Sequence, residues 1–221
     1  MVTAWLRGLT GLVLQSNCLL CDRPHNNLLC PACERRLQSY RRRQPGALWQ
    51  GDLPLWVWGR YGGTLKQAIT RLKYDPQPEL ARFLGFWLGE SWQQSPPIPQ
   101  RPVLVPIPMH ADKQRQRGFN QAERLARSFS HCTQLRLAQG LERIRATEAM
   151  FGLKPEEREQ NVAAAFRLAP DFQRRRPRQP VLLVDDIYTT GATARAAAQV
   201  LTQAGITVAG IAAVATTREH P

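Results

Sequence analysis

One segment of the chain, residues 181–193, constrains the fold more than any other. It begins with a continuous apolar run, Val181–Val184, continues through two adjacent aspartates, and ends in a small turn rich in hydroxyl groups. An alanine-rich stretch follows over 192–204, and the glycine that comes next, Gly205, is a typical helix stop. Because a buried strand that leads directly into a helix is the repeating unit of a parallel sheet, this segment predicts an α/β fold.

The spacing of apolar residues elsewhere agrees with that fold. Helices are expected over 63–73, 79–92 and Asn120 to about Leu137, and strands over 103–105, 162–168 and 206–214. With 43% apolar residues in 221, the chain can bury a core without help from a partner. The sequence therefore predicts a parallel sheet flanked by helices.

The turn after the apolar run has the chemistry of a ribose-phosphate site. Adjacent carboxylates such as Asp185 and Asp186 repel each other unless they are hydrated, metal-bound or hydrogen-bonded to a polyol, and ribose hydroxyls with magnesium nearby would meet that need. The following turn offers free backbone N–H groups, three hydroxyls and the positive end of a helix, all of which suit a phosphate. The predicted phosphate-binding residues are Thr189, Thr190, Gly191, Ala192 and Thr193.

Four of the five cysteines form two CxxC knuckles near the amino terminus. Cys18 and Cys21 make the first knuckle, and Cys30 and Cys33 make the second, eight residues further along. Each knuckle can direct two thiolates at one tetrahedral ion, so we expect a structural Zn²⁺ that supplies folding free energy to a segment with few apolar residues. Two disulfides are the competing interpretation, and a reducing compartment would disfavour them.

The net charge of +13, from 30 basic and 17 acidic residues, favours an anionic partner. Arginines flank the cysteine segment, and three tryptophans, Trp49, Trp56 and Trp58, follow closely. Basic groups interleaved with aromatic rings suit single-stranded nucleic acid, although a solvated charge run beside core tryptophans is an equally good interpretation. The candidate nucleic-acid-binding residues are Arg35, Arg36, Arg41, Arg42 and Arg43.

The sequence gives no sign of membrane insertion or secretion. The apolar stretch Trp5–Leu14 is interrupted by Arg7 and Gly8, is too short to span a bilayer and has no cleavage site. We therefore expect a cytoplasmic protein without a transmembrane helix.

The motifs also resemble known families. The strand, paired acids and Thr/Gly-rich turn over 181–193 resemble those of type I phosphoribosyltransferases. With the cysteine knuckles, the strings Val105–Pro108 and Arg117–Gln121, and Arg158 with Asn161 and Phe166, are similar to the ComF family of competence-related, phosphoribosyltransferase-like proteins. The resemblance extends over nearly the whole chain and implies two parts, a zinc module at 1–45 and a phosphoribosyltransferase-like domain at 55–221.

The resemblance also implies roles for basic residues. A loop over His110–Arg117 would bind diphosphate through Lys113, Arg115 and Arg117, although an exposed basic loop without a ligand explains the first two as well. Arg143, Arg145 and Arg158 would lie on or around a closing loop.

Two functions follow from these expectations. The first is a competence factor that acts in DNA uptake and natural transformation. It would bind a phosphoribosyl or nucleotide ligand and handle single-stranded DNA, together with a DNA-translocating helicase or other competence proteins. The second is a metabolic or salvage phosphoribosyltransferase with a structural zinc knob, in which Asp185 and Asp186 orient the ribose of phosphoribosyl diphosphate and bind Mg²⁺. Whether the chain is an enzyme stays open at the level of the sequence.

Overall fold

The computed structural model describes residues 17–75, 77–145 and 165–218. Within these ranges the strands are β1 (Leu55–Arg60), β2 (Val103–Pro106), β3 (Leu141–Arg143), β4 (Phe166–Leu168), β5 (Val181–Tyr188) and β6 (Val208–Thr216). The helices are α1 (Pro31–Gln38), α2 (Gly63–Tyr74), α3 (Leu80–Gln94), α4 (Ala111–Arg117), α5 (Gln121–Thr133), α7 (Pro170–Arg174) and α8 (Ala192–Gln203).

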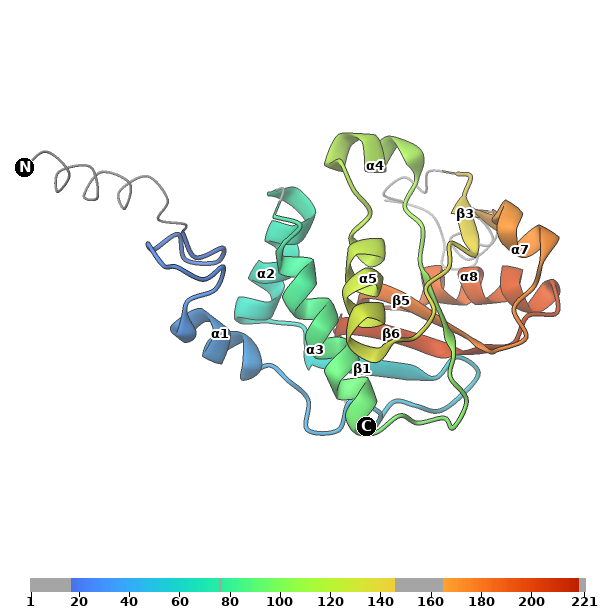
Figure 1. Ribbon diagram of the computed structural model, residues 1–221, viewed down its shortest axis with the longest axis horizontal. Helices are drawn as coiled ribbons and strands as arrows, with labels where there is room; N and C mark the ends of the chain where they lie inside the picture. The colour runs from blue at the N-terminus through green and yellow to red at the C-terminus, as the bar shows by residue number, and fades with distance from the viewer. Residues whose placement is uncertain (1–16, 76, 146–164, 219–221) are drawn as a thin grey trace, which may run out of the picture.

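The main sheet contains four parallel strands in the order β1-β6-β5-β2. Helices cover both of its faces, with α2, α3 and α5 on one side and α8 on the other (Figure 1). Alternate residues of β5 belong to the two halves of the core. Leu182 and Val184 pack on the side of α2, α3 and α5, while Val181 and Leu183 pack on the side of α8. The predicted fold class, a parallel α/β sheet flanked by helices, is confirmed.

The structure corrects several boundaries. The helix expected to reach Leu137 ends at Thr133, because Gln134 takes a left-handed conformation with φ 56°. The strand expected to end at Val184 continues to Tyr188, since its pairing with β6 persists to that residue. Asp185 and Asp186 therefore lie within the strand and not in the turn after it.

One strand of the main sheet and one strand of a second sheet were not predicted. β1 contains Trp56 and Trp58, which are 2% and 0% exposed and belong to the core. β3 pairs with β4 in a two-stranded antiparallel sheet, and β4 is the described part of the strand expected over 162–168.

The cysteine segment packs onto α2. Cys18, Cys33 and Leu37 belong to the same apolar cluster as residues of α2. Arg71 of that helix forms a bidentate ion pair with Asp22, at 2.7 and 3.0 Å. Arg71 also donates to the Leu19 carbonyl at 2.9 Å. The division of the chain into two domains stays a prediction.

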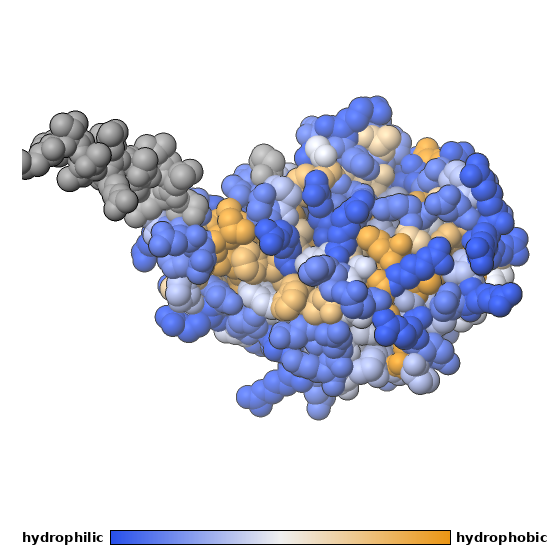
Figure 2. Space-filling model, in the orientation of Figure 1, coloured by the Kyte–Doolittle hydropathy of each residue, from blue (hydrophilic) through white to orange (hydrophobic). Residues whose placement is uncertain are grey.

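Hydrophilic side chains cover most of the face drawn in Figure 2, with apolar patches between them. Among the described residues, no helix combines the length and the apolar character that crossing a membrane requires. Tyr74, at the carboxyl end of α2, is an exposed aromatic with 73% of its surface accessible, and it lies at the mouth of the cavity that follows.

Candidate functional site

A cavity of about 330 Å³ opens at the carboxyl edge of the sheet, where ligands bind in open α/β folds. It brings together residues that are far apart in the sequence. Six of its lining residues were predicted as site residues: Lys113, Arg117, Asp185, Asp186, Thr189 and Thr193. Lys73 and Tyr74, which were not predicted, line it as well, together with Asn120 and Gln121 of the string Arg117–Gln121.

The two aspartates lie in different surroundings. Asp186 is 4% exposed, and one of its carboxylate oxygens, Oδ2, lies 2.9 Å from the ammonium of Lys73. That contact is an ion pair, because the oxygen makes no aligned hydrogen bond with a described residue. Asp185 is partly exposed, and its Oδ1 accepts the backbone N–H of Asp186 at 2.8 Å. Oδ2 of Asp186 is therefore buried against Lys73, and Asp185 is the more exposed of the two acids.

The surroundings of Asp185 disfavour its negative charge. Burial and the charge of Asp186 raise the pKa of the Asp185 carboxyl to about 7, although the backbone N–H of Asp186 and the cations Lys73 and Arg143 oppose the rise. In the free protein this carboxyl is therefore partly protonated near neutral pH. Hydroxyl donors or a metal ion would favour its charged form.

The predicted phosphate-binding turn, residues 189–193, is fixed by a glycine and by two arginine side chains. Gly191 has φ 82°, and a Cβ at this position would collide with the hydroxyl of Tyr188, so glycine is required here. The carbonyl of Thr190 accepts N–H groups from Arg195 at 2.9 Å and Arg218 at 3.1 Å. These two arginines were not predicted, and both lie outside the motif of residues 181–193.

The predicted basic loop His110–Arg117 is a short helix, α4. Lys113 and Arg117 reach the cavity, but Arg115 does not line it and instead pairs with Asp112. Arg117 donates to Gln121 at 2.7 Å and lies over the Tyr74 ring, 5.5 Å from its centroid.

The string Arg117–Gln121 has a local structural reason. Gly118 ends α4 with a positive φ of 84°, and the side chain of Asn120 caps α5 by accepting the backbone N–H of Ala122 at 3.0 Å. The Asn120 amide also donates to the Ile107 carbonyl at 3.1 Å, which ties this turn to the end of β2.

Among the residues predicted around a closing loop, Arg143 enters the cavity. Burial lowers the pKa of Arg143, and the negative charge of Asp185 opposes that effect, so these two groups influence each other across the cavity. Arg145 is exposed and does not line the cavity, and Arg158 lies outside the described residues.

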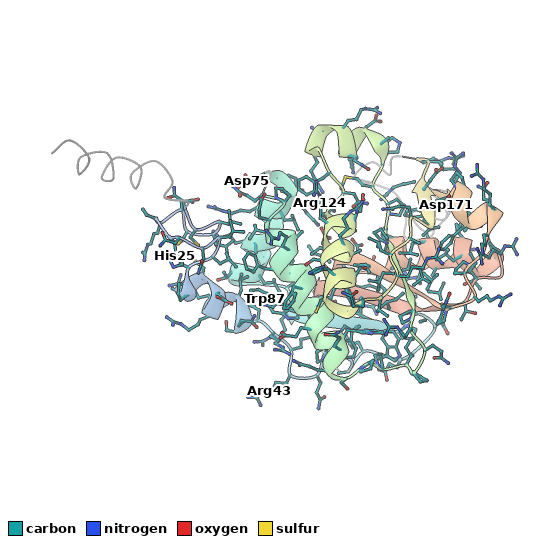
Figure 3. The ribbon with its side chains drawn as sticks, in the orientation of Figure 1. His25, Arg43, Asp75, Trp87, Arg124 and Asp171 are labelled. Carbon is teal, nitrogen blue, oxygen red and sulfur yellow. The ribbon has the colours of Figure 1, made fainter. Side chains whose placement is uncertain are left out.

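The four cysteines form one cluster that is compatible with a structural zinc site. Their sulfur atoms all lie within 4.8 Å of one another, and none is joined in a disulfide. The Sγ atoms of Cys21 and Cys30 are 3.8 Å apart, and tetrahedral zinc with bonds of about 2.3 Å separates its sulfurs by roughly that distance. Burial raises the pKa of the Cys18 thiol, but nearby backbone N–H groups, that of Cys30 above all, outweigh it and bring this pKa down to about 6. His25 does not belong to the cluster (Figure 3).

The predicted nucleic-acid-binding arginines differ in accessibility. Arg35, Arg36 and Arg43 are exposed, Arg41 is half-buried and donates to Gln94 at 2.7 Å, and Arg42 is 9% exposed. The suggestion that Trp56 and Trp58 stack on bases is wrong, because both rings are buried.

The comparisons with known proteins point to one group of relatives. No protein-family model matches the chain. Competence protein F of Haemophilus influenzae is 29% identical over 186 residues, which cover 80% of this chain and 80% of the relative. Competence protein ComFC of Bacillus subtilis is 27% identical over 209 residues, covering 90% of this chain and 75% of the relative. The DNA utilization protein YhgH of Salmonella typhi is 28% identical over 186 residues, covering 80% and 79%.

Among solved structures, that of the allosteric regulatory enzyme of purine biosynthesis aligns with 62% of this chain and 26% of its own length, at 18% sequence identity and a TM-score of 0.39. The sequence relatives extend over most of the chain, and they confirm the resemblance to the ComF family that the motifs indicate.

Proposed function

We propose that this chain acts in DNA uptake and natural transformation as a ComF-like protein, and that its α/β domain binds a phosphoribosyl or nucleotide ligand. The names of its relatives, competence proteins and DNA utilization proteins, support the biological role. The cavity at the carboxyl edge of β5 supports the ligand.

One observation carries the ligand assignment: a single cavity is lined by two acids, by several cations and by two threonines of the predicted phosphate-binding turn. Asp185 and Asp186 can accept hydrogen bonds from a sugar diol, whereas Lys113 and Arg117, both on α4, provide positive charge for a diphosphate. The turn from Thr189 to Thr193 completes a place for the 5-phosphate. Phosphoribosyl diphosphate carries all three groups on one molecule.

We also propose that the protein binds two kinds of metal ion, Mg²⁺ and Zn²⁺. Mg²⁺ would enter with phosphoribosyl diphosphate and be held through water by Asp185 and Asp186, the carboxylates nearest the expected diphosphate. Zn²⁺ would be held by Cys18, Cys21, Cys30 and Cys33 and would stabilise the amino-terminal segment, residues 1–45, as a module beside the domain at 55–221.

Single-stranded DNA would be bound through arginine. Arg35, Arg36, Arg41 and Arg43 each present at least part of the side chain to solvent, whereas Arg42 would contribute charge from a buried position. In this role the protein would act in the cytoplasm beside a DNA-translocating helicase or other competence proteins.

A second candidate function is catalysis of phosphoribosyl transfer. It is favoured by the placement of Lys113 and Arg117 in the same cavity as the two acids, because a departing diphosphate needs cations near the sugar. Release of diphosphate from phosphoribosyl diphosphate in the presence of a nitrogen base would identify an enzyme. Binding without release would identify a ligand-regulated binding protein.

Calorimetry with phosphoribosyl diphosphate and Mg²⁺ tests the ligand assignment. The double variant Asp185→Asn, Asp186→Asn removes the charge-assisted hydrogen bonds to the ribose, and we expect its affinity to fall about ten- to a hundredfold, equivalent to about 1.5 to 3 kcal/mol. Asp52→Asn, at an exposed loop position away from the cavity, is the matched control and should bind as the wild type does. Wild-type affinity in the double variant would show that the acids serve only the fold or a metal.

A further inference from the structure

A second and larger cavity, of about 800 Å³, lies beside the ends of β1 and β6. Five of its ten lining residues are arginines, and none is acidic. The arginines come from three separate places in the chain: Arg41, Arg42 and Arg43 from the segment after α1, Arg60 from the end of β1, and Arg218 from just beyond β6. We call this cavity the arginine cleft.

Backbone pairing fixes the walls of the arginine cleft. The N–H of Arg42 donates to the Trp58 carbonyl at 2.8 Å, and the N–H of Arg60 donates to the Tyr40 carbonyl at 2.9 Å, so the segment after α1 runs beside β1. β1 and β6 are parallel neighbours in which Arg60 is paired with Thr216. The arginines are therefore brought together by the sheet.

Positive charge accumulates in the cleft without an internal counter-charge. Among the described residues, none of its five arginines forms an ion pair with an acid. Burial lowers the pKa of Arg42, and the positive charge of Arg60 lowers it further, as expected where like charges are crowded. A bound anion would relieve this repulsion.

The cleft continues into an adjoining hollow of about 490 Å³, which shares Arg41, Arg42 and Arg43 with it. The hollow is also lined by Gln94 and Ser95 at the end of α3, and no acid lines it. Figure 3 places Arg43 at the lower edge of the molecule, and the same edge is hydrophilic in Figure 2. An elongated, acid-free track suits a linear polyanion better than a compact one.

We propose that the arginine cleft binds the phosphodiester backbone of single-stranded DNA, and that Arg218 belongs both to this cleft and to the support of the phosphate-binding turn. This inference rests on the proposed function for its ligand, and it adds a location, the residues Arg60 and Arg218, and a physical link between two sites.

The contacts of Arg218 supply that link. Its guanidinium donates to the Thr190 carbonyl and lies over the Tyr188 ring, 4.8 Å from the centroid. Its backbone N–H donates at 3.1 Å to the hydroxyl of Thr216, which in turn donates to the Tyr188 carbonyl at 2.7 Å. Arg218 is thus fixed against the turn while it lines the cleft.

A third cavity provides a matched control. It measures about 830 Å³ and is lined by Arg174 and Arg178 together with other arginines, but it also contains Asp171. It lies at the amino end of β5, since Arg178 precedes that strand, whereas the arginine cleft lies at the carboxyl ends of β1 and β6.

The first test measures fluorescence anisotropy of labelled oligothymidylate over a range of salt concentrations. We compare Arg43→Gln, Arg60→Gln with Arg174→Gln, Arg178→Gln, because each double variant removes two positive charges from exposed positions. The first should bind at least tenfold more weakly, and its plot of log affinity against log salt should be shallower by about 1.4, or about 0.7 for each lost phosphate contact. The affinity of Arg174→Gln, Arg178→Gln for the oligonucleotide should stay within about twofold of that of the wild type.

Equal losses in both double variants would overturn the proposal, because binding would then follow net charge alone. A larger loss in Arg174→Gln, Arg178→Gln would also overturn it and would move the site to the third cavity. No binding by the wild-type chain would overturn it as well, yet would leave the sugar-phosphate site untouched.

The second test separates the two roles of Arg218 by titrating ribose 5-phosphate and oligothymidylate independently. Arg60→Gln should weaken only the oligonucleotide, whereas Arg218→Gln should weaken both. The loss of ribose 5-phosphate affinity should be about two- to fivefold, because Arg195 still holds the Thr190 carbonyl. If Arg218→Gln left ribose 5-phosphate binding unchanged, the shared role would be wrong. Failure of ribose 5-phosphate to bind the wild type would instead contradict the proposed function and, with it, the link.

Discussion

Asp185 and Asp186 show how one strand can give adjacent, identical residues different chemistry. In a strand, successive side chains point to opposite faces, so only one of the two can lie against α2. Asp186 faces Lys73 of that helix and is buried with a partner, whereas Asp185 is left with two distant cations and a raised pKa of about 7. The pair therefore combines one carboxylate held in an ion pair with one whose charge responds to ligand and pH.

Stability should depend on pH through Asp185. Its pKa is raised from 3.8 in the unfolded chain to about 7 in the fold, so the folded state keeps a proton that the unfolded state releases. The contribution of this carboxyl is therefore most favourable below the unfolded pKa and is lost as pH rises toward the folded one. Asp185→Asn removes the effect, and its unfolding free energy should exceed that of the wild type by about 1 to 3 kcal/mol at pH 8 but by much less at pH 4.

Urea denaturation of the two proteins at several pH values measures this difference. Asp52→Asn is a suitable control, because that carboxylate is exposed. If the difference in unfolding free energy between the wild type and Asp185→Asn stayed constant with pH, the pKa of the Asp185 carboxyl would have its ordinary value in the fold.

At the scale of the elements, α2 and β5 are joined by an ion pair across the cavity. Lys73 is the residue before the end of α2, and its ammonium reaches the strand at Asp186. Removing one partner of a largely buried pair leaves the other charge without compensation, which is more costly than removing both.

Lys73→Met should therefore destabilise the fold by about 2 to 3 kcal/mol, and Asp186→Asn should recover much of that loss when the two are combined. Chemical denaturation of the two single variants and the double variant gives the coupling energy. Strictly additive losses would show that the ion pair contributes nothing. Lys66→Met, on an exposed part of α2, controls for the loss of a lysine.

Helices and strands with a clear hydrophobic periodicity were predictable. Elements whose position depends on tertiary contacts were not. The apolar stripes of α2 and α3 place their helices to within a few residues, because each buries one face. β1 was not predicted, because tryptophans beside a charge run suit a nucleic-acid surface and a core equally well, and the burial of Trp58 is decided only by its strand entering the sheet. The end of α5 depends on a left-handed Gln134, which has no strong sequence signal.

The candidate site was predictable where a local motif marks it, as in residues 185–193 and in the basic segment that contains Lys113 and Arg117. Residues 185–193 are contiguous, so their shared turn could be inferred from the sequence. Lys73, Arg195 and Arg218 contact the same site from α2, from α8 and from the segment after β6. They could not be predicted, because only the tertiary fold brings them close to it.

At the scale of the whole molecule, the cysteine segment and the sheet share one apolar cluster. Leu20, Leu29 and Leu37 pack with residues of α2 and α3, so unfolding of the segment would expose part of the main core. This contact qualifies the simplest expectation for such a module, in which loss of its metal leaves the rest of the chain unaffected.

Purified protein should contain about one zinc per chain, and Cys21→Ser should lower that content to near zero. We expect the variant to keep the parallel sheet, with a lower midpoint of thermal unfolding and earlier proteolytic cleavage before β1. Elemental analysis and circular dichroism measure these effects. Cys132→Ser is the matched control, since Cys132 lies on α5 outside the sulfur cluster. Full zinc content in Cys21→Ser would rule out the four-cysteine site.

From the position of α2 we infer that the proposed zinc site and the proposed sugar site would depend on each other. The same helix contacts the cysteine segment through Arg71 and, two residues later, contacts Asp186 through Lys73. A chain deprived of zinc would lose the anchor for the end of this helix, and the grip of Lys73 on Asp186 would loosen with it. Starvation for a trace element would thereby lower the affinity for a sugar phosphate, although the metal never touches that ligand.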